Sequence, residues 1–408
     1  MTRLPVANRE LIRAINRSSV LNLVKTHGPL SRTGVARLSG LSPATVTDIV
    51  AELIGERLVY EKEPGDSTGG RRPILLAINH TARYAIGIKL MEQQIIAALT
   101  DLSATVLAGI TQPLEDGQSL DRAVQALAAA VETLVEQAGA ERQKLVGVGV
   151  GLAGVVDSAR GVCRYSPVFS WRNAPLRDLL QARIGIPVYL DNDVNTLTLA
   201  ERLFGAGQGV DDFLVVTVGR GVGMGIVVHG QPYRGTRGGG GEFGHTVLDP
   251  NGPLCGCGKR GCLEAYVSDP AILRMAREAL ARGEIALGAQ DLTAPRLVEL
   301  ACAGNQPLQS VFRQAGQMLG LGIANLIDVF SPRLIIITGE GVRAGDLLFR
   351  PMRESIHRHA FADLADDAAI VIQEWGDDAW ARGAASLVLQ EFFRSPIEGG
   401  VGIPQGLA

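Results

Sequence analysis

Residues 239–264 read GGGEFGHTVLDPNGPLCGCGKRGCLE and carry an unusual density of metal-binding side chains. Three of the five cysteines of the chain, Cys255, Cys257 and Cys262, lie in this segment, and His245 precedes them. Three thiolates and one imidazole complete the tetrahedral ligand set of Zn²⁺ and leave no position for water, as in structural zinc sites. The alternative is a group of buried or oxidisable cysteines in a glycine-rich turn, but a Cys-Gly-Cys spacing fits disulfide geometry poorly. The segment therefore predicts a structural Zn²⁺ site.

Two carboxylates, Glu242 and Glu264, lie near the two ends of the same segment. A metal-bound loop would hold them rigidly. Carboxylate oxygens accept hydrogen bonds, which suits them to the hydroxyl groups of a small polyol. We therefore expect a polyol-binding site beside the metal.

A second polar group is the run LDNDVN at 190–195, which follows a predicted strand and opens a predicted helix. Such a junction lies at the rim of an α/β cleft, where ligands usually bind. Asp193 could act as a general base for a sugar hydroxyl, and Asn192 could hydrogen-bond another. Capping of the helix N-terminus by Asp191 or Asn192 explains the same residues without a ligand.

The length and composition indicate a globular protein of two or three domains, since 408 residues exceed what one core usually supports. Hydrophobic residues make up 46% of the chain and charged residues 20%. The sequence shows neither an apolar run of membrane length nor a signal peptide. Because three of five cysteines are assigned to a metal, a disulfide framework is not expected. These features predict a cytoplasmic, nucleoid-associated protein without membrane insertion.

The charge is unevenly distributed along the chain. Residues 1–80 carry 11 Lys and Arg against 7 Asp and Glu, a net charge of +4, whereas the remainder carries −7. Within residues 1–40 the imbalance is 7 against 1. A basic end on an acidic body is typical of a nucleic-acid-binding head.

The amino-terminal region predicts a helix-turn-helix. Helices are expected at 8–27, at 32–39 after a Ser31 cap, and from Pro43 to about residue 57 after a Ser42 cap. The third helix presents small polar residues near its start, as do recognition helices that enter the major groove. The candidate DNA contacts in these helices are Arg32, Ser42, Ala44, Thr45, Thr47 and Asp48.

A wing follows these helices. Two short strands are expected at 58–60 and 74–78, joined by a loop that ends in GGRRP at 69–73. Arg71 and Arg72 at its tip are candidate contacts to phosphate or to a narrow minor groove. The alternative is a three-helix protein-interaction module with a solvated basic loop. The combination of basic charge, helix-turn-helix and wing favours DNA.

The first part of the remaining chain predicts one α/β unit. Three consecutive strands are expected at 84–90, 95–100 and 106–112, followed by an amphipathic helix at 120–138 and an apolar strand at 146–152. A second set of elements resembles it. Two such blocks of three strands and a helix in tandem would form two lobes with a cleft between them.

The second set begins with strands at 213–218 and 223–229 and continues, after the metal segment, with helices between 271 and 330, a buried strand at 334–338 and a helix at 380–393. Between its first two strands lies GRGVGMG at 219–225. This turn could bring backbone N–H groups to a phosphate, although a plain hairpin explains it equally well.

Three signatures occur in order: NDVN at 192–195, EFGH at 242–245, and the Cys-x-Cys-x4-Cys-Leu-Glu run that ends at Glu264. Together they resemble the ROK family, which groups sugar kinases with sugar-responsive repressors. The winged head resembles the repressor branch, which includes regulators of glucose, N-acetylglucosamine and xylose genes. Residues 151–157, GLAGVVD, also look like the family's Gly-x-x-Gly-x-Val-Asp turn at the floor of the cleft.

The resemblance implies an α/β fold in which a winged helix-turn-helix precedes a two-lobed, actin-like (ribonuclease H-like) ATPase domain. It implies a monosaccharide site lined by Asn192, Asp193, Glu242, His245 and Glu264. His245 would bind zinc through one ring nitrogen and the sugar through the other. The expected domains are the head at 1–80, a first lobe at 81–192 completed by a helix at about 379–394, a second lobe with the zinc loop at 193–378, and a tail at 395–408.

Departures from the family pattern point away from catalysis. Family kinases open the body with Asp-x-Gly-Gly-Thr, a turn that cradles ATP phosphates, whereas residues 87–92 here read GIKLME. The motif is thus degraded at 88–92, and Arg220 stands where kinases usually have Thr. Asp193 is then a vestigial base that accepts a hydrogen bond from the sugar. In the head, Asp48 replaces a residue that is often basic in these repressors, which alters the expected operator sequence.

The sequence therefore predicts a non-enzymatic transcriptional regulator, foremost a repressor of carbohydrate uptake or catabolism genes that a monosaccharide relieves. Its expected partners are double-stranded operator DNA, the monosaccharide and a second copy of the chain, as a homodimer or dimer of dimers. An ATP-dependent sugar kinase with an appended DNA-binding head is the alternative from another functional class. Control by a partner protein, such as a sugar-transporter subunit, is a further alternative.

Overall fold

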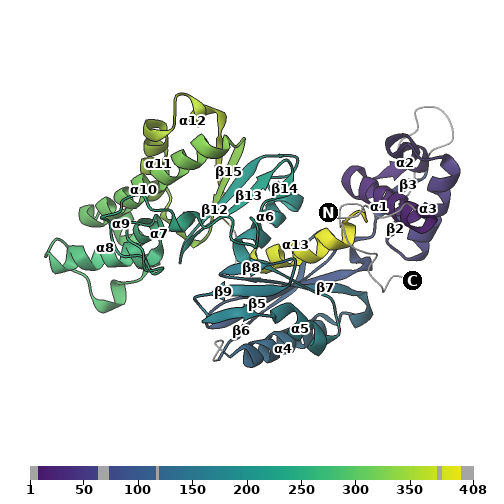
Figure 1. The fold of residues 1–408 in the computed structure, drawn as a ribbon, viewed down its shortest axis with the longest axis horizontal. Helices are drawn as coiled ribbons and strands as arrows, with labels where there is room; N and C mark the ends of the chain where they lie inside the picture. The colour runs from purple at the N-terminus through teal and green to yellow at the C-terminus, as the bar shows by residue number, and fades with distance from the viewer. Residues whose placement is uncertain (1–7, 63–72, 116–118, 375–378, 397–408) are drawn as a thin grey trace.

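The computed structural model of the protein describes residues 8–62, 73–115, 119–374 and 379–396. Along the chain, a small helical head is followed by two lobes, each built on a five-stranded sheet (Figure 1). No helix within these residues is long and apolar enough to cross a membrane.

The head contains three helices, α1 (Arg9–His27), α2 (Arg32–Ser39) and α3 (Pro43–Gly55). Each helix begins after a residue whose side-chain oxygen accepts a hydrogen bond from the backbone N–H three residues later: Asn8, Ser31 and Ser42. Such a bond satisfies one of the free donors of a helix start. The predicted caps at Ser31 and Ser42 are confirmed.

A three-stranded sheet completes the head, in the order β1 (Leu30–Ser31), β3 (Leu75–Ile78), β2 (Val59–Lys62). The antiparallel pairing of β2 with β3 gives the predicted wing hairpin. β1 was not expected from the sequence, because two residues are too few to show a strand pattern. The predicted wing tip with Arg71 and Arg72 lies outside the described residues.

The first lobe is a mixed sheet with helices on both faces. Its strands run in the order β11 (Val188–Asn192), β7 (Leu145–Leu152), β4 (Tyr84–Leu90), β5 (Gln94–Thr100), β6 (Val106–Pro113). β4, β5 and β6 form an antiparallel meander, and β7 and β11 are parallel to β4. The helices α4 (Leu120–Ala138) and α5 (Leu176–Ile184) pack on one face and bury an aliphatic core.

A small antiparallel sheet was not expected from the sequence. It consists of β8 (Val155–Asp157), β9 (Val162–Ser166) and β10 (Trp171–Ala174). Each of these strands has five residues or fewer, so periodicity gave no signal. β8 forms the end of the GLAGVVD segment at 151–157. The small sheet therefore begins directly after the turn that lines the cleft.

The second lobe has strands in the order β14 (Gln231–Pro232), β13 (Val222–Val228), β12 (Phe213–Val218), β15 (Leu334–Thr338), β16 (Ala369–Ile372). Its helices are α6 (Asp193–Phe204), α7 (Glu264–Val267), α8 (Asp269–Ala281), α9 (Ala294–Cys302), α10 (Gln306–Phe330), α11 (Asp346–His359) and α12 (Leu364–Asp367). The predicted repeat is wrong in detail here. The third strand, β14, has two residues and leads into the 239–264 segment rather than into a helix.

The last helix, α13 (Ala379–Phe393), runs between the two lobes toward the head (Figure 1). It lies directly on the backbone of β4 and β7. A side chain at Gly87 would overlap the carbonyl oxygen of Ala381, and one at Gly149 would overlap that of Ala384. The far end of α13 contributes Leu389 and its neighbours to the apolar core of the head. Head and body thus share one core through this helix.

Candidate functional site

The predicted metal ligands come together. The donor atoms of His245, Cys255, Cys257 and Cys262 all lie within 4.8 Å of one another. The sulfurs of Cys257 and Cys262 are 3.7 Å apart, as are the Cys255 sulfur and Nδ1 of His245. A tetrahedron with Zn–S bonds of about 2.3 Å has edges of about 3.8 Å. The spacing is too long for a disulfide and fits a shared cation.

Short-range backbone bonds shape this cluster. The N–H of Cys255 donates to the carbonyl of Lys259 over 2.8 Å, and the N–H of Gly258 donates back to Cys255 over 2.9 Å. Gly258 and Gly261 have φ values of +90° and +69°, which glycine adopts without strain. The Lys259 ammonium donates to the carbonyl oxygen of His245 over 2.6 Å, and this bond fixes the histidine against the cysteine turn.

The pKa values of the three thiols are shifted in different directions. For Cys257 the effect of burial is outweighed by hydrogen bonds from the Lys259 backbone and from the other two thiols, which lower its pKa. Burial raises the pKa of Cys255 to about 12, and the neighbouring sulfurs of Cys257 and Cys262 add to this effect. Burial raises the pKa of Cys262 as well. Crowded thiolates are costly without a counter-charge, and a bound divalent cation supplies it. The residues present therefore fit a structural zinc ion.

A cavity of about 570 Å³ opens between the lobes beside the cluster. Its lining includes all five residues predicted to bind sugar: Asn192, Asp193, Glu242, His245 and Glu264. They come from the end of β11, the start of α6, the metal segment and the start of α7. Pockets for small molecules usually measure about 300–1,000 Å³. The cavity is thus large enough for a monosaccharide.

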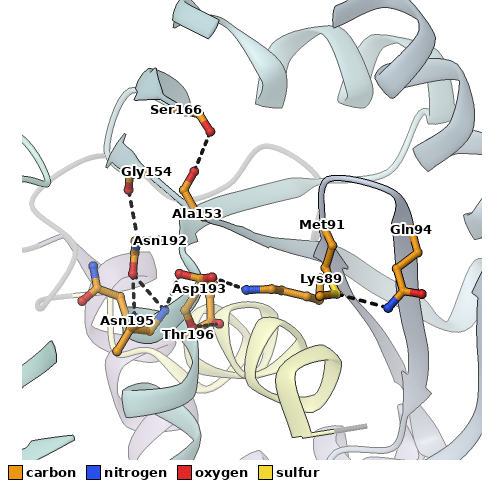
Figure 2. Close-up of polar contacts among 11 residues, drawn as sticks. Lys89, Met91, Gln94, Ala153, Gly154, Ser166, Asn192, Asp193, Asn195 and Thr196 are labelled. Carbon is orange, nitrogen blue, oxygen red and sulfur yellow. Dashed lines mark hydrogen bonds and ion pairs between the residues drawn. The ribbon is translucent and has the colours of Figure 1, made fainter. Parts of the chain in front are cut away.

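Asn192 caps the helix that follows it. Its Oδ1 accepts hydrogen bonds from the N–H groups of Val194, at 2.8 Å, and Asn195, at 3.3 Å, and its Nδ2 donates to the carbonyl of Gly154 over 3.0 Å (Figure 2). The alternative interpretation of this segment, in which Asn192 caps the helix N-terminus, is therefore confirmed for Asn192. Its remaining Nδ2 hydrogen is the group that could reach a sugar.

Asp193 is buried and forms an ion pair with Lys89, which reaches it from β4 (Figure 2). The Lys89 ammonium also lies 4.2 Å from the centre of the Trp380 ring on α13, a cation–π distance. The other Asp193 oxygen accepts from the N–H of Val194 at 3.0 Å. The carboxylate is therefore engaged on both oxygens by the protein.

The two glutamates lie on the metal side of the cavity. Glu264 accepts a hydrogen bond from the N–H of Val222 at 3.1 Å, so its second oxygen is the one that faces His245 Nδ1, at 4.0 Å. Burial raises the pKa of Glu242; His245 opposes this shift, and Glu264 and Asp193 add to it. Five carboxylates line the cavity, since Glu92 and Glu340 also belong to its lining, and they provide several acceptors for hydroxyl groups.

Two residues predicted to depart from the kinase pattern, Glu92 and Arg220, contact each other across the cleft. Arg220, in the turn between β12 and β13, forms an ion pair with Glu92, which follows β4, at 2.9 Å. The glycine-rich turn is closed by a bond from the N–H of Gly219 to the carbonyl of Gly221 at 3.0 Å. Within the described residues the turn is thus a tight hairpin, as the alternative interpretation of this segment predicted.

Several of the predicted DNA contacts share one surface of the head. Ser42, Ala44, Thr47 and Asp48 are exposed at the start of α3, with Thr45 half-buried beside them. Arg32 is half-buried and pairs with Glu61 of β2 at 2.7 Å, so part of its guanidinium is engaged within the head.

Sequence reasoning missed three residues at these sites. Lys89 and Trp380 surround Asp193, and Arg37 on α2 is exposed with no ion pair or hydrogen bond to another described side chain. The sequence did contain a signal for Lys89: it lies inside the otherwise apolar strand β4, and a buried charge requires a partner. The contact of Trp380 with Lys89 joins residues about 290 positions apart and left no local pattern.

A family model described as "ROK family" matches residues 85–391. The xylose repressor of Caldicellulosiruptor bescii is 30% identical over 96% of this chain and 99% of its own length. The DNA-binding transcriptional dual regulator NagC of Escherichia coli K12 is 32% identical over 94% of both chains. Matches of this extent include most of the head as well as the body.

Solved structures agree with this pattern. A ROK family transcriptional regulator, described as a homologue of the E. coli MLC protein, has a TM-score of 0.84 at 28% identity and covers 95% of this chain and 98% of its own. A ROK family glucokinase from Streptomyces griseus, solved with glucose and AMPPNP, has a TM-score of 0.66 at 32% identity. It covers 74% of this chain and 98% of its own. The predicted two-lobed, actin-like fold behind an amino-terminal head is confirmed.

Proposed function

The chain belongs to the ROK family, as its motifs predicted, and from this premise we propose that it is a DNA-binding transcriptional repressor of carbohydrate genes that a monosaccharide releases. The observation that carries the proposal is the extent of the matches. The relatives named as repressor or transcriptional regulator match 96% and 94% of this chain, which includes most of the head, whereas the glucokinase matches 74% of it. Only the regulator needs a head that reads DNA.

The monosaccharide binds in the cavity between the lobes. Glu242, Glu264 and Asp193 accept hydrogen bonds from its hydroxyls, and Asn192 donates one through its free amide hydrogen. His245 offers Nδ1 to the metal, because this atom faces the cysteines, and its other ring nitrogen faces the sugar. Xylose, glucose and N-acetylglucosamine are the first candidates, because relatives of this chain are named xylose repressor and N-acetylglucosamine repressor and a related glucokinase was solved with glucose.

Zn²⁺ is the metal that best fits the Cys3His set, since soft thiolates and imidazole in a closed tetrahedron favour it. It would be held by His245, Cys255, Cys257 and Cys262. Bound there, it supplies rigidity and positive charge rather than catalysis. The loop then holds Glu242 and Glu264 at the spacing the sugar requires.

The response travels from the cavity to the head through α13. At one end of this helix Trp380 covers Lys89, the partner of Asp193. At the other end the carbonyl of Phe393 accepts a hydrogen bond from Asn22 of α1 at 2.7 Å. A sugar that rearranges the Lys89–Asp193 pair therefore acts on the same helix that holds the head. A coupling of about 1–3 kcal/mol is enough to change DNA occupancy appreciably.

The head binds the major groove with the start of α3, and Arg32, Arg71, Arg72 and Arg37 contact phosphates. Two copies of the chain, as a homodimer or dimer of dimers, present two heads to half-sites about 34 Å apart. The sugar changes the spacing of the heads and releases the DNA.

The test starts from duplexes selected by the purified protein from a randomised library. Fluorescence anisotropy then measures their affinity as each monosaccharide is added. We expect affinity to fall with salt, by a slope that reflects the phosphates contacted, and to fall further with one sugar. Failure to enrich any duplex, or a flat salt response, would overturn the proposal.

The kinase alternative keeps one supporting observation, the retained Asp193. Incubation with ATP, Mg²⁺ and the same sugars decides it, because turnover above that of an Asp193→Asn control would establish catalysis. If the selected duplex is released by no sugar but by a cell fraction containing sugar-transporter subunits, control by a partner protein is the better account.

A further inference from the structure

The four side chains of the metal cluster differ in their exposure to solvent. Cys255 and Cys262 are buried and His245 is half-buried, whereas Cys257 is exposed. Of the three cysteines in the cluster, only Cys257 belongs to the described lining of the cavity between the lobes. One sulfur of the cluster is therefore open to small solutes that enter the cavity.

This exposed sulfur has a second one close to it. The sulfurs of Cys257 and Cys262 are 3.7 Å apart, so a shift of about 1.7 Å would bring them to the S–S bonding distance. Glycines flank Cys257 on both sides, and a side chain built on Gly256 or Gly258 would meet no atom within 4 Å. The backbone around Cys257 thus faces open space and has room for such a shift.

We propose that Cys257 is a peroxide-reactive site, at which hydrogen peroxide produces a disulfide with Cys262 and so removes the metal from the cluster. The Cys257 thiolate attacks one peroxide oxygen: the S–O bond forms, the O–O bond breaks, and the leaving hydroxide takes a proton to become water. The Cys262 thiolate then attacks the sulfenic sulfur: the S–S bond forms, the S–O bond breaks, and a second water leaves. The two thiolates supply the two electrons that reduce the peroxide.

Oxidation at this position would act on the neighbouring sugar site. The cluster would keep only His245 and Cys255 of its four donors, which are too few for a structural zinc site. The segment that carries Glu242 and Glu264 would then lose its rigid support, and the response to sugar would be lost. This consequence rests on the proposed function. Conversely, a sugar in the cavity would cover Cys257 and slow its oxidation.

The experiment treats the full-length, zinc-loaded protein with a small excess of hydrogen peroxide. A chromogenic chelator measures the zinc released, and peptide mass spectrometry identifies the joined cysteines. We expect release of about one zinc per chain and a disulfide between Cys257 and Cys262, both reversed by dithiothreitol and added zinc. Cys302 is the internal control, because it is exposed but lies outside the cluster. The variant Cys302→Ser should release zinc as the wild type does.

Cys257→His removes the reactive sulfur but keeps a zinc ligand, since Cys2His2 sets also hold structural zinc. Its zinc content is measured first, and it should retain the metal at a peroxide concentration that empties the wild type. If this variant binds no metal, the mapping of the joined cysteines in the wild type decides the proposal by itself.

Three results would overturn the proposal. The first is a wild type that keeps its zinc while Cys302 is oxidised. The second is a disulfide that joins a different pair of cysteines. The third is equally fast loss of zinc from the wild type and from zinc-loaded Cys257→His.

A sugar arm separates this inference from the proposed function. At about ten times its Kd a sugar leaves about a tenth of the cavities free, so zinc release should slow about tenfold. An unchanged rate with a sugar that calorimetry shows to bind would refute the protection of Cys257 by the ligand. If no sugar binds, the proposed function fails, while zinc release and the disulfide still decide the oxidation.

Discussion

Lys89 and Asp193 form a buried ion pair between the first strand of the body and the first turn of α6 (Figure 2). The pair joins the strand β4 to the start of the helix that follows β11, on the wall of the cavity between the lobes. Asp193 is thereby held in one position by contacts within the protein. Lys89, Asp193 and the Glu92–Arg220 ion pair all line this cavity.

Replacement of Lys89 by methionine should strongly destabilise the protein. The change leaves the Asp193 carboxylate buried without a partner, and such losses cost about 3–5 kcal/mol. The measurement is urea unfolding followed by circular dichroism. The double variant Lys89→Met, Asp193→Asn removes both charges and should recover most of the loss. Equal stability of Lys89→Met and wild type would show that the pair does not form in solution.

Replacement of Cys257 by serine should remove the metal. The hydroxyl is a poor ligand for a soft site, so the remaining three ligands hold zinc weakly. Elemental analysis of the purified protein should fall from about one zinc per chain to well below that value. The control is Cys302→Ser, which changes an exposed cysteine outside the cluster and should leave the metal in place. Full metal content in Cys257→Ser would refute the ligand assignment.

Replacement of Glu242 by alanine should abolish the response to sugar and spare DNA binding. Glu242 lines the cavity but is distant in the chain from the head, and loss of hydrogen bonds to a charged acceptor typically costs about 1.5–3 kcal/mol of sugar affinity. Calorimetry measures this loss, and anisotropy measures the affinity for DNA. Glu354→Ala, an exposed change on α11, is the matched control. A variant that loses DNA affinity but keeps sugar affinity would contradict this division of roles.

Much of the fold and of the site could be predicted because local sequence determines them. Periodicity predicted α4 at 120–138 and β15 at 334–338, both of which the structure has at these bounds, and the metal ligands lie within 18 residues of one another. Capping chemistry located the starts of α2 and α3 for the same reason. Local patterns of this kind need no knowledge of the rest of the chain.

What could not be predicted depends on contacts between distant segments. Lys89 gains its role only when α6 and α13 pack around β4, and the core shared by the head and α13 joins residues more than 350 positions apart. The short strands β8, β9 and β10 pair with one another but are too brief to show alternation. The cavity lined by α1 of the head and by α13, β11 and α6 of the body likewise exists only after the head has packed on the body.

Replacement of Asn22 by alanine should weaken the coupling between sugar and DNA. The amide of Asn22 donates to the Phe393 carbonyl at 2.7 Å and so joins α1 to the end of α13. Loss of a single such bond costs about 1 kcal/mol, or roughly fivefold in the sugar-induced change of DNA affinity. Sugar affinity itself, measured by calorimetry, should stay within about twofold, since neither Asn22 nor Phe393 lines the sugar cavity between the lobes. Asn305→Ala, which removes the cap of α10, should alter stability but leave the coupling unchanged. If the coupling is unchanged in Asn22→Ala, the contact between Asn22 and Phe393 does not transmit the sugar response from α13 to the head.

The stability of the protein should rise with pH between about 8 and 10 because of Lys25. Burial and the nearby Arg202 lower the pKa of Lys25 from its ordinary value of 10.5 to about 8. Between these values the unfolded chain binds more protons than the folded one, so the free energy of unfolding increases as pH rises through this range. Urea unfolding at several pH values, in buffer without phosphate, should therefore show a rise in wild type that is smaller in Lys25→Met. Parallel curves for the two proteins would mean that Lys25 keeps an ordinary pKa and is more exposed to water than the structure indicates.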